Sequence, residues 1–308
     1  MRKVRNPKKT AKRIILIVII ILAAFWSYAL FRPIAPRSYE KHTPTGGAVE
    51  EKYIAHGEYK VKKASYKMPP PIAEIVVYYP SDLTKGSEKY PMVLFANGTG
   101  VLPNKYKAVF KHLASWGFIV AGNYDPNPGN GLSMDDTLKF MLEEGENPES
   151  IFYNKIDEEN IGIAGHSQGG AAALATISLC GHKDVYKCAA ALSPAQEDIS
   201  RPLGWTYDLE KIQIPVMLAA GTETEFENQV VIPLSALNSM YDKLPAQKVM
   251  MRRIGMEHGG MLYTADGYVT AWFMYHLKED MEAGKAFLGE NPEILGNGLY
   301  CDQRIEYE

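Results

Sequence analysis

The stretch Asn160–Leu179 reads NIGIAGHSQGGAAALATISL and decides the fold. Its first half is an apolar run typical of a strand that is buried on both faces. The segment 165–169 is a G-x-S-x-G motif, and a run of small residues follows it, as expected of a helix packed closely against a sheet. A strand, a sharp turn and a helix in this order present a serine hydroxyl above the sheet. The sequence therefore predicts Ser167 as a nucleophile, and the alternative is a tight glycine-rich turn without chemistry.

Apolar and amphipathic segments alternate on both sides of this stretch. Strands are predicted at Lys60–Tyr66, Glu74–Pro80, Pro91–Gly98, Phe118–Tyr124, Asn160–Ser167, Cys188–Pro194, Ile214–Gly221 and Lys248–Gly255. Helices are predicted at Tyr106–Trp116, Met134–Leu142, Gly169–Leu179, Leu234–Leu244 and Gly267–Asp280. This alternation predicts an α/β fold with a mainly parallel central sheet, helices on both faces and an antiparallel opening pair of strands. Active groups gather beyond the carboxyl ends of the strands in such a sheet.

A serine nucleophile needs a base, and histidine suits this role because its pKa lies near neutrality. His258 follows the last predicted strand in the sequence EHGG, where two glycines allow the loop to bend toward the sheet. We therefore predict His258 as the base. The other six histidines lie in predicted helices, in or near the predicted linker, in a polar turn or beside the nucleophile: His112, His276, His42, His56, His182 and His166.

The acid that orients the imidazole should follow the strand Ile214–Gly221. The segment 221–227 reads GTETEFE and holds three carboxylates, of which spacing favours Glu225 over Glu223, with Glu227 third. Asp198 or Glu197, after the preceding strand, remains a further possibility. The other carboxylates of this segment are expected to be solvated.

Charge that develops on a carbonyl oxygen is stabilised by fixed backbone N–H groups. One donor should be the N–H of Gln168, the residue after the nucleophile. The loop 97–100, NGTG, follows the third predicted strand, and its glycines allow the backbone to approach a ligand. We predict Thr99 as the second oxyanion donor, with Gly98 as its neighbour, and the alternative is an ordinary glycine turn.

Charge is distributed unevenly along the 308 residues, whose net charge is −3. Met1–Arg13 carries seven basic residues and no acid. The rest of the chain therefore holds 26 of the 33 basic residues and all 36 acidic residues, which gives it a net charge of −10. Phosphate neutralisation supplies most of the affinity for nucleic acid, so this acidic body argues against a nucleic-acid partner. Metal-ligand motifs such as CxxC or HExxH are missing from the sequence, and we expect no metal or organic cofactor.

Ile14–Phe31 is a stretch of 18 residues without a charge. As a helix it would span roughly 27 Å, close to the hydrocarbon thickness of a bilayer. The basic cluster before it predicts a single-pass anchor with a cytoplasmic N-terminus and an extracytoplasmic body. The alternative is a signal peptide that is cleaved to release a secreted protein.

Residues 32–57 contain proline, glycine and charges without periodicity, and we interpret them as a linker to a catalytic domain at 58–308. Cys180 and Cys188 flank a polar turn and could pair as a disulfide, which would leave Cys301 alone. Three ordinary thiols are the alternative, because sequence alone does not fix disulfide connectivity.

These residues resemble the bacterial polyester-hydrolase and cutinase-like branch of the α/β-hydrolase superfamily, which is related to dienelactone hydrolases and platelet-activating-factor acetylhydrolases. The resemblance covers about Tyr66–Leu288 and rests on NGTG, HLASWGFIVAGNYD, IGIAGHSQGGAAAL, IPVMLAAGTETE, and MEHGG followed by YVTAWFMYHLKED. It implies an α/β-hydrolase fold. It also implies Ser167 as the nucleophile, Glu225 as the acid, His258 as the base, and the amides of Thr99 and Gln168 as the oxyanion hole.

The sequence departs from that family at two places. Members usually have aspartate where Glu225 stands, and a tryptophan after the sixth strand that helps to clamp an aromatic acyl group. The corresponding segment here offers Ala195 and Gln196, so Trp205 in the following insertion is the candidate substitute. The insertion Ala195–Leu209 is also our candidate lid.

We predict a serine carboxylic-ester hydrolase, esterase- or lipase-like, that works through a Ser-His-Glu triad and an acyl-enzyme. Its substrate would be a small-molecule, lipid or polyester ester, and its oligomeric state stays open. One alternative is a catalytically silent binding domain on the hydrolase fold. The other is an acyltransferase or peptidase that uses the same triad.

Overall fold

The computed structural model describes residues 33–307. The predicted basic tail Met1–Arg13 and the predicted transmembrane helix Ile14–Phe31 therefore lie outside the described residues. Within 33–307, none of the helices combines the length and the apolar character that crossing a bilayer would require.

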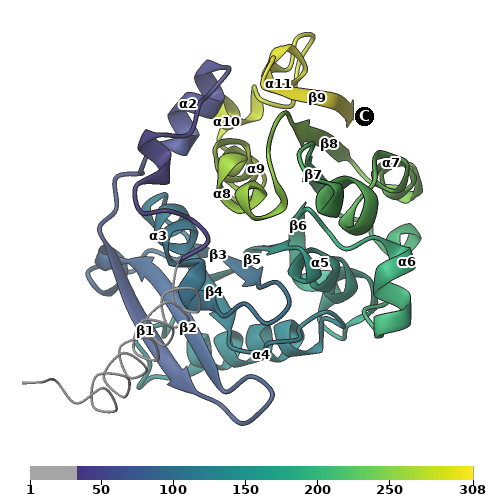
Figure 1. Cartoon of the computed structure of the whole chain (residues 1–308). Coiled ribbons are helices and arrows are strands. Elements are labelled where there is room, and N and C mark those ends of the chain that lie inside the picture. Colours follow the sequence, from purple (N-terminus) through teal and green to yellow (C-terminus); the bar gives the residue numbers. More distant parts are fainter. Residues whose placement is uncertain (1–32, 308) are drawn as a thin grey trace, which may run out of the picture.

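The described chain builds one nine-stranded sheet in the order β1-β2-β4-β3-β5-β6-β7-β8-β9 (Figure 1). Strands β3 to β8 run parallel to one another, whereas β1, β2 and β9 are antiparallel to their neighbours. The strands are β1 (Val61–Lys67), β2 (Glu74–Pro80), β3 (Tyr90–Ala96), β4 (Ile119–Asn123), β5 (Ile156–His166), β6 (Tyr186–Leu192), β7 (Val216–Gly221), β8 (Lys248–Arg253) and β9 (Tyr300–Glu306). The eight predicted strands and the antiparallel opening pair are confirmed.

Helices cover both faces of the sheet. One face carries α4 (Leu132–Glu146), α5 (Gln168–Leu179) and α7 (Leu234–Lys243), and the other carries α3 (Lys107–Ser115), α8 (Met261–Thr264) and α9 (Asp266–Lys278) (Figure 1). Shorter helices are α2 (Ala48–Ile54), α6 (Glu197–Ser200), α10 (Met281–Gly284) and α11 (Glu293–Gly296). The five predicted helices are present, and Gly117 ends α3 with a φ of 90°.

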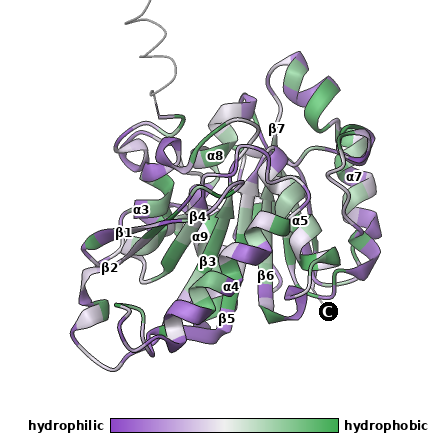
Figure 2. Cartoon of the chain, turned by 90° about the horizontal axis from the view of Figure 1, so that it is seen from below, coloured by the Kyte–Doolittle hydropathy of each residue, from purple (hydrophilic) through white to green (hydrophobic). Residues whose placement is uncertain are grey.

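Two hydrophobic layers sandwich the sheet. Strands β3 to β8 are buried on both faces over most of their length, which explains their unbroken apolar runs. Figure 2 shows β3 and β5 as largely hydrophobic strands in the middle of the molecule. The α/β fold with a mainly parallel sheet is thus confirmed, and it is the architecture expected of an α/β-hydrolase.

Residues 33–57 differ from the predicted linker. This segment, which we call the strap, packs on the domain through α2 and through a single 3-10 turn η1 (Tyr39–Lys41). Tyr39 and Tyr53 are fully buried in the core, and the Tyr53 hydroxyl donates to Asp280 Oδ2 over 2.6 Å. The prediction of a linker was wrong because composition alone did not reveal the aromatic residues that fix the segment.

The three cysteines are free thiols, and Cys180 and Cys188 are buried. The possible disulfide between them is therefore not formed. Burial raises the pKa of the Cys180 thiol to about 11, which makes this thiol unreactive.

Candidate active site

Ser167 lies at the point where β5 ends and α5 begins. Its backbone has φ 61° and ψ −125°, a strained conformation for a residue other than glycine. The Ser167 N–H donates to Leu192 O over 2.9 Å, and the Ser167 carbonyl accepts from the N–H groups of Gly170 and Ala195. The serine is therefore held on a sharp turn at the carboxyl ends of the parallel strands, with its side chain half-buried.

The motif glycines are required by the tightness of this turn. A Cβ at Gly165 would lie 1.9 Å from Gly169 O, and a Cβ at Gly169 would lie 2.1 Å from Ala96 O. Side chains at these positions would push α5 away from β3 and β5. The small residues read from the sequence are thus explained by the geometry that exposes the serine hydroxyl.

His258 lies in the 3-10 turn η8 (His258–Gly260) after β8, and its Nδ1 is 2.6 Å from Glu227 Oε2. The His258 side chain is 14% exposed and the Glu227 side chain is 0% exposed. The other carboxylate oxygen, Oε1, accepts from Ser193 Oγ over 2.6 Å and from Gly221 N over 2.8 Å. An ionised carboxylate can only accept hydrogen bonds, so Nδ1 of His258 carries the proton and Nε2 presents its lone pair.

The acid beside His258 is Glu227 and not the predicted Glu225. Glu225 is exposed at the start of the π-helical turn η7 (Phe226–Val231), and Glu223 is exposed as well. Glu227 lies one residue inside that turn and is buried together with Val231. The partner of His258 is therefore Glu227 instead of the predicted Glu225, because the π-helical turn brings Glu227, and not Glu225, back over the sheet.

A helical periodicity in the sequence could have found Glu227. It precedes the apolar Val231 by four residues, so both share one face of a helical turn. Glu225 precedes the polar Gln229 by the same spacing. Counting residues from the end of the strand, as for an extended loop, missed this signal.

Hydrogen bonds keep the Glu227 carboxylate charged. Burial alone would raise its pKa, but the bonds from His258, Gly221 and Ser193 lower the pKa of Glu227 below its usual range. A charged, fixed carboxylate beside Nδ1 is the arrangement that stabilises an imidazolium.

His166 connects the serine turn to the histidine turn. Its Nε2 donates to His258 O over 2.8 Å, and the two rings lie 4.7 Å apart between centroids. Burial and the nearby charge of His258 lower the pKa of His166 to about 3, so this ring is neutral. Within residues 33–307 its Nδ1 has no hydrogen-bond partner. The ring is therefore a neutral support under the His258 backbone.

Ser167 and His258 are brought to the same rim by this contact, although they are 91 positions apart in the chain. Their side chains are not hydrogen-bonded to each other in the structure. Catalytic hydrogen bonds are often long before a substrate binds and tighten in the reacting complex.

The predicted oxyanion loop lies beside the serine. A Cβ at Gly98 would lie 3.3 Å from Ser167 Cβ. The Gly98 N–H is used by Tyr106, whose hydroxyl oxygen accepts it over 2.8 Å, whereas Thr99 is exposed. Gln168 is the first residue of α5, where an N–H has no partner within the helix. The loop 97–100 and Gln168 thus both lie next to Ser167, and the roles of the Thr99 and Gln168 amides stay predictions.

The insertion Ala195–Leu209 packs next to the same turn. Trp205 Nε1 donates to Asn127 Oδ1 over 3.1 Å, and the same oxygen accepts from Gln168 Nε2. The Trp205 indole covers Gly129, where a Cβ would lie 2.3 Å from the ring. Sequence reasoning named Trp205 but missed Asn127, which joins the tryptophan to the residue after the nucleophile.

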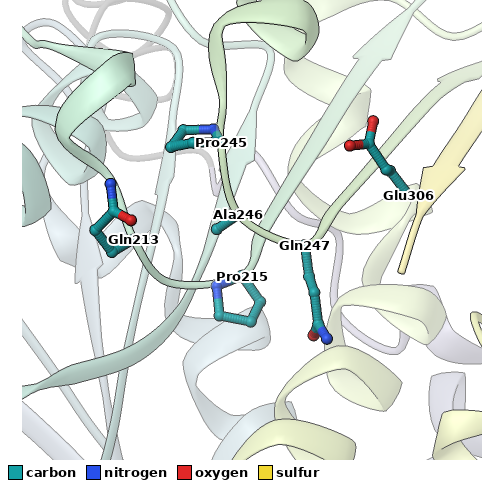
Figure 3. Close-up of a pocket in the computed structure, with 6 residues that line it drawn as sticks. All are labelled: Gln213, Pro215, Pro245, Ala246, Gln247 and Glu306. Carbon is teal, nitrogen blue, oxygen red and sulfur yellow. The ribbon is translucent and has the colours of Figure 1, made fainter. Parts of the chain in front are cut away.

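The hollow in Figure 3 belongs to the other end of the sheet. It measures about 430 Å³ and is lined by residues that precede β7 and β8, together with Glu306 at the end of β9. These residues are Gln213, Pro215, Pro245, Ala246, Gln247 and Glu306. In the described chain, no three His, Cys, Asp or Glu side chains are grouped so that they could hold a metal ion. Ser167, His258 and Glu227 lie instead at the carboxyl ends of the parallel strands.

Residues 47–193 match the Chlorophyllase family. The chain is similar to chlorophyllases. It is 25% identical over 151 residues to "Chlorophyllase-1, chloroplastic" of Citrus unshiu, a match that covers 46% of this chain and 45% of the relative. The corresponding protein of Citrus sinensis is 24% identical over 151 residues, with the same coverage. The chain thus matches less than half the length of these curated relatives.

The matched segment covers only part of the site described above. The segment 47–193 contains the oxyanion loop and Ser167, but it ends before Glu227 and His258. The predicted polyester-hydrolase and cutinase-like branch does not emerge from these comparisons and stays a prediction.

Proposed function

We propose that the chain is a serine carboxylic-ester hydrolase in which Ser167 is the nucleophile, His258 the base and Glu227 the acid. The observation that carries the proposal is the 2.6 Å contact between His258 Nδ1 and Glu227 beside the strained serine turn. A serine on such a turn, a histidine with a presented Nε2 and a buried charged carboxylate fit two-step acyl transfer.

In the proposed reaction, Ser167 Oγ attacks the ester carbonyl carbon and its proton passes to Nε2 of His258. Glu227 stabilises the imidazolium, and the amides of Thr99 and Gln168 donate to the oxygen that becomes negative. The C–O bond to the alcohol breaks, and the imidazolium gives its proton to the leaving oxygen. Water, deprotonated by His258, then attacks the acyl carbon, the bond from that carbon to Ser167 Oγ breaks, and the imidazolium returns the proton to Oγ as the acid leaves.

The acyl side of the site is proposed to lie along Trp205. The Trp205 indole is half-buried and is linked through Asn127 to Gln168, the residue after the nucleophile, and it offers a flat apolar surface. This supports an ester with an apolar acyl group, including the polyester or cutin-like substrates implied by the sequence resemblance.

We further propose that Ile14–Phe31 anchors the protein in the cell membrane, with the N-terminus in the cytoplasm and the catalytic domain outside. The support is the charge-free stretch and the seven basic residues before it.

The test is activity-based labelling of the full chain with a fluorophosphonate, together with hydrolysis of p-nitrophenyl butyrate. Ser167→Ala should lose the label and reduce kcat by about 10⁵- to 10⁶-fold, as expected for removal of a triad nucleophile. Ser235→Ala, an exposed serine on α7, is the matched control and should keep both.

Two outcomes would overturn the proposal. A folded wild-type chain that neither reacts nor hydrolyses would favour a silent binding domain, and full activity in Ser167→Ala would exclude the assigned nucleophile. Product analysis with an added acceptor alcohol separates hydrolysis from acyl transfer, because a new ester would form in the second case.

A further inference from the structure

The first residues of the strap lie on the catalytic rim. The Ile34 N–H donates to Lys105 O over 3.2 Å, in the turn η3 (Pro103–Lys105) that follows the oxyanion loop. A Cβ at Gly259 would lie 3.7 Å from Ile34 Cγ2, and Gly259 is the neighbour of His258. Ile34 therefore lies between the two segments that flank the serine turn.

The strap is fixed to the domain along its length. The Tyr39 hydroxyl donates to Asp266 in the buried core, and Arg253 donates to the carbonyl of Pro44. The N–H groups of Val49 and Glu50 donate to the two carboxylate oxygens of Glu293 over 2.7 and 2.9 Å. The strap is thus a docked part of the domain and cannot extend as a spacer without breaking these contacts.

Chain geometry then sets how far the rim can lie from the proposed anchor. From Phe31, the end of the charge-free stretch, the chain advances by three residues to reach Ile34. Three extended residues reach at most roughly 10 Å. With the proposed anchor, Ile34 would lie within about that distance of the point where the chain leaves the bilayer, and Gly259 of the rim lies beside Ile34.

Large apolar side chains are exposed at this same end of the sheet. Phe226 is 54% exposed and its ring meets the His258 ring edge-on, 5.2 Å between centroids. Val230 in the same turn η7 and Leu203 in the turn η5 (Arg201–Leu203) of the insertion are exposed as well, and Ile254 follows the end of β8. Leu203, Phe226, Val230 and Ile254 form what we call the apolar rim. Large apolar side chains that are exposed at one end of a domain are typical of a contact surface.

Basic side chains surround the start of the strap. Arg37, Lys107 and Lys111 line a hollow of about 480 Å³ together with Pro33 and Glu40. Cationic side chains are attracted to a surface that contains anionic lipid when they lie within about a Debye length of it. The three cations would favour contact with a membrane surface beside the point where the chain leaves it.

We propose that the catalytic rim faces the bilayer that holds Ile14–Phe31, and that the substrate is an acyl ester drawn from that bilayer. The short connection at Ile34, the apolar rim and the basic hollow place one end of the sheet against the lipid headgroups. An ester of a membrane lipid can then reach Ser167 without first dissolving in water. This inference rests on the ester hydrolase proposed above.

The test uses the full chain in vesicles of phosphatidylcholine and phosphatidylglycerol. The measured quantity is the ratio of two rates, hydrolysis of a fluorescent long-chain ester embedded in the vesicles and hydrolysis of dissolved p-nitrophenyl acetate. The double variant Leu203→Ser and Val230→Ser should lower this ratio about tenfold, since a loss of 1.4 kcal/mol of apolar contact is a factor of ten. Leu179→Ser, an exposed apolar residue at the opposite end of α5, should leave the ratio unchanged.

A second measurement does not depend on activity. Single cysteines at Leu203 or Leu179, in a chain whose native cysteines are replaced by serine, carry an environment-sensitive fluorophore. Lipid-borne quenchers should quench the label at position 203 and spare the label at position 179.

The outcomes separate the two proposals. Failure of the wild-type chain to hydrolyse either ester would overturn the ester hydrolase. Hydrolysis of both esters with an unchanged ratio in the rim variant, or equal quenching at positions 203 and 179, would overturn the membrane-facing orientation and leave the hydrolase standing.

Discussion

The described chain contains two histidine–carboxylate pairs of nearly equal length that include a fully buried carboxylate. His258 Nδ1 is 2.6 Å from Glu227, and His112 Nδ1 is 2.7 Å from Asp266. Both carboxylates are buried, and both histidines gain an anionic partner. A pair of this kind therefore does not by itself identify a catalytic base.

The second ring nitrogen distinguishes the two pairs. Nε2 of His112 bonds to Ala55 O over 2.8 Å, and the whole ring is buried. Nε2 of His258 has no hydrogen-bond partner among residues 33–307, and its ring is partly exposed at the rim that holds Ser167. The pair His112–Asp266 thus fixes the strap to α3 and α9, whereas the pair His258–Glu227 keeps one nitrogen available for a proton.

Among the changes that test this difference between the two pairs, the largest effect should come from Glu227→Gln. A neutral amide cannot stabilise the imidazolium and favours the wrong tautomer, so kcat should fall by about 10³- to 10⁴-fold. Glu225→Gln is the matched control and should keep kcat within about twofold, because surface substitutions rarely matter. Steady-state hydrolysis of p-nitrophenyl butyrate measures both. A large loss in the Glu225 variant with little loss in the Glu227 variant would return the acid role to Glu225.

Disruption of the pair His112–Asp266 should lower the stability of the fold and leave kcat nearly unchanged. Asp266→Ala leaves a buried histidine without its anion and should lower the free energy of unfolding by about 3–5 kcal/mol. Activity of the folded fraction should change little. Denaturant unfolding in detergent measures the effect, with Asp242→Ala as control, since its exposed ion pair with Arg304 should contribute less than about 1 kcal/mol. Loss of kcat without loss of stability in Asp266→Ala would reverse the roles of the two pairs.

His166 makes the free energy of unfolding depend on pH, which a side chain without a titratable group would not do. Its pKa is lowered from 6.5 to about 3, so below pH 6.5 the unfolded chain binds a proton that the folded chain does not. Its contribution to stability is complete above pH 6.5 and is lost as the pH falls toward 3. Between pH 8 and pH 5 the loss should be about 2 kcal/mol for one such group.

His166→Gln should remove this loss, so its unfolding free energy should vary less than that of the wild type between pH 8 and pH 5. The pKa of His112 is raised by the charge of Asp266 in spite of its burial, so that pair favours folding at low pH. Its contribution is common to both proteins and cancels in the comparison. His42→Gln, at an exposed histidine, is the control. Parallel curves for the wild type and His166→Gln would contradict the assigned protonation state.

Most of the sheet could be predicted from the sequence, because each of the six buried parallel strands corresponds to an apolar run. β9 (Tyr300–Glu306) was missed, since it is an antiparallel edge strand with polar and charged residues and half-exposed side chains. The strap was missed for a related reason. Its buried tyrosines find their partners, Asp266 and Asp280, 227 positions further along the chain, and local patterns do not report such contacts.

The site was predictable where one residue type is required at one place. Only glycine fits at 165 and 169, and the loop after β8 brings His258 to the serine turn. The acid was harder, because three glutamates shared one loop and a π-helical turn selected among them. Ser193 was not singled out, since nothing in its local sequence shows that its hydroxyl meets Glu227.

The smallest effect should come from Ser193→Ala, which removes one of the two hydrogen bonds to Glu227 Oε1 and keeps the bond from Gly221. The pKa of Glu227 should rise toward its ordinary value, so the acidic limb of kcat/KM should move to higher pH. We expect kcat at pH 8 to fall about three- to tenfold, because only part of the 1.5–3 kcal/mol of a charge-assisted hydrogen bond is lost in the transition state. Ser200→Ala is the control, since its equally buried hydroxyl donates to Ala195 O and not to Glu227. If both serine variants show the same rate and the same acidic limb, then Ser193 supports the fold alone and Glu227 is held sufficiently by Gly221 and His258.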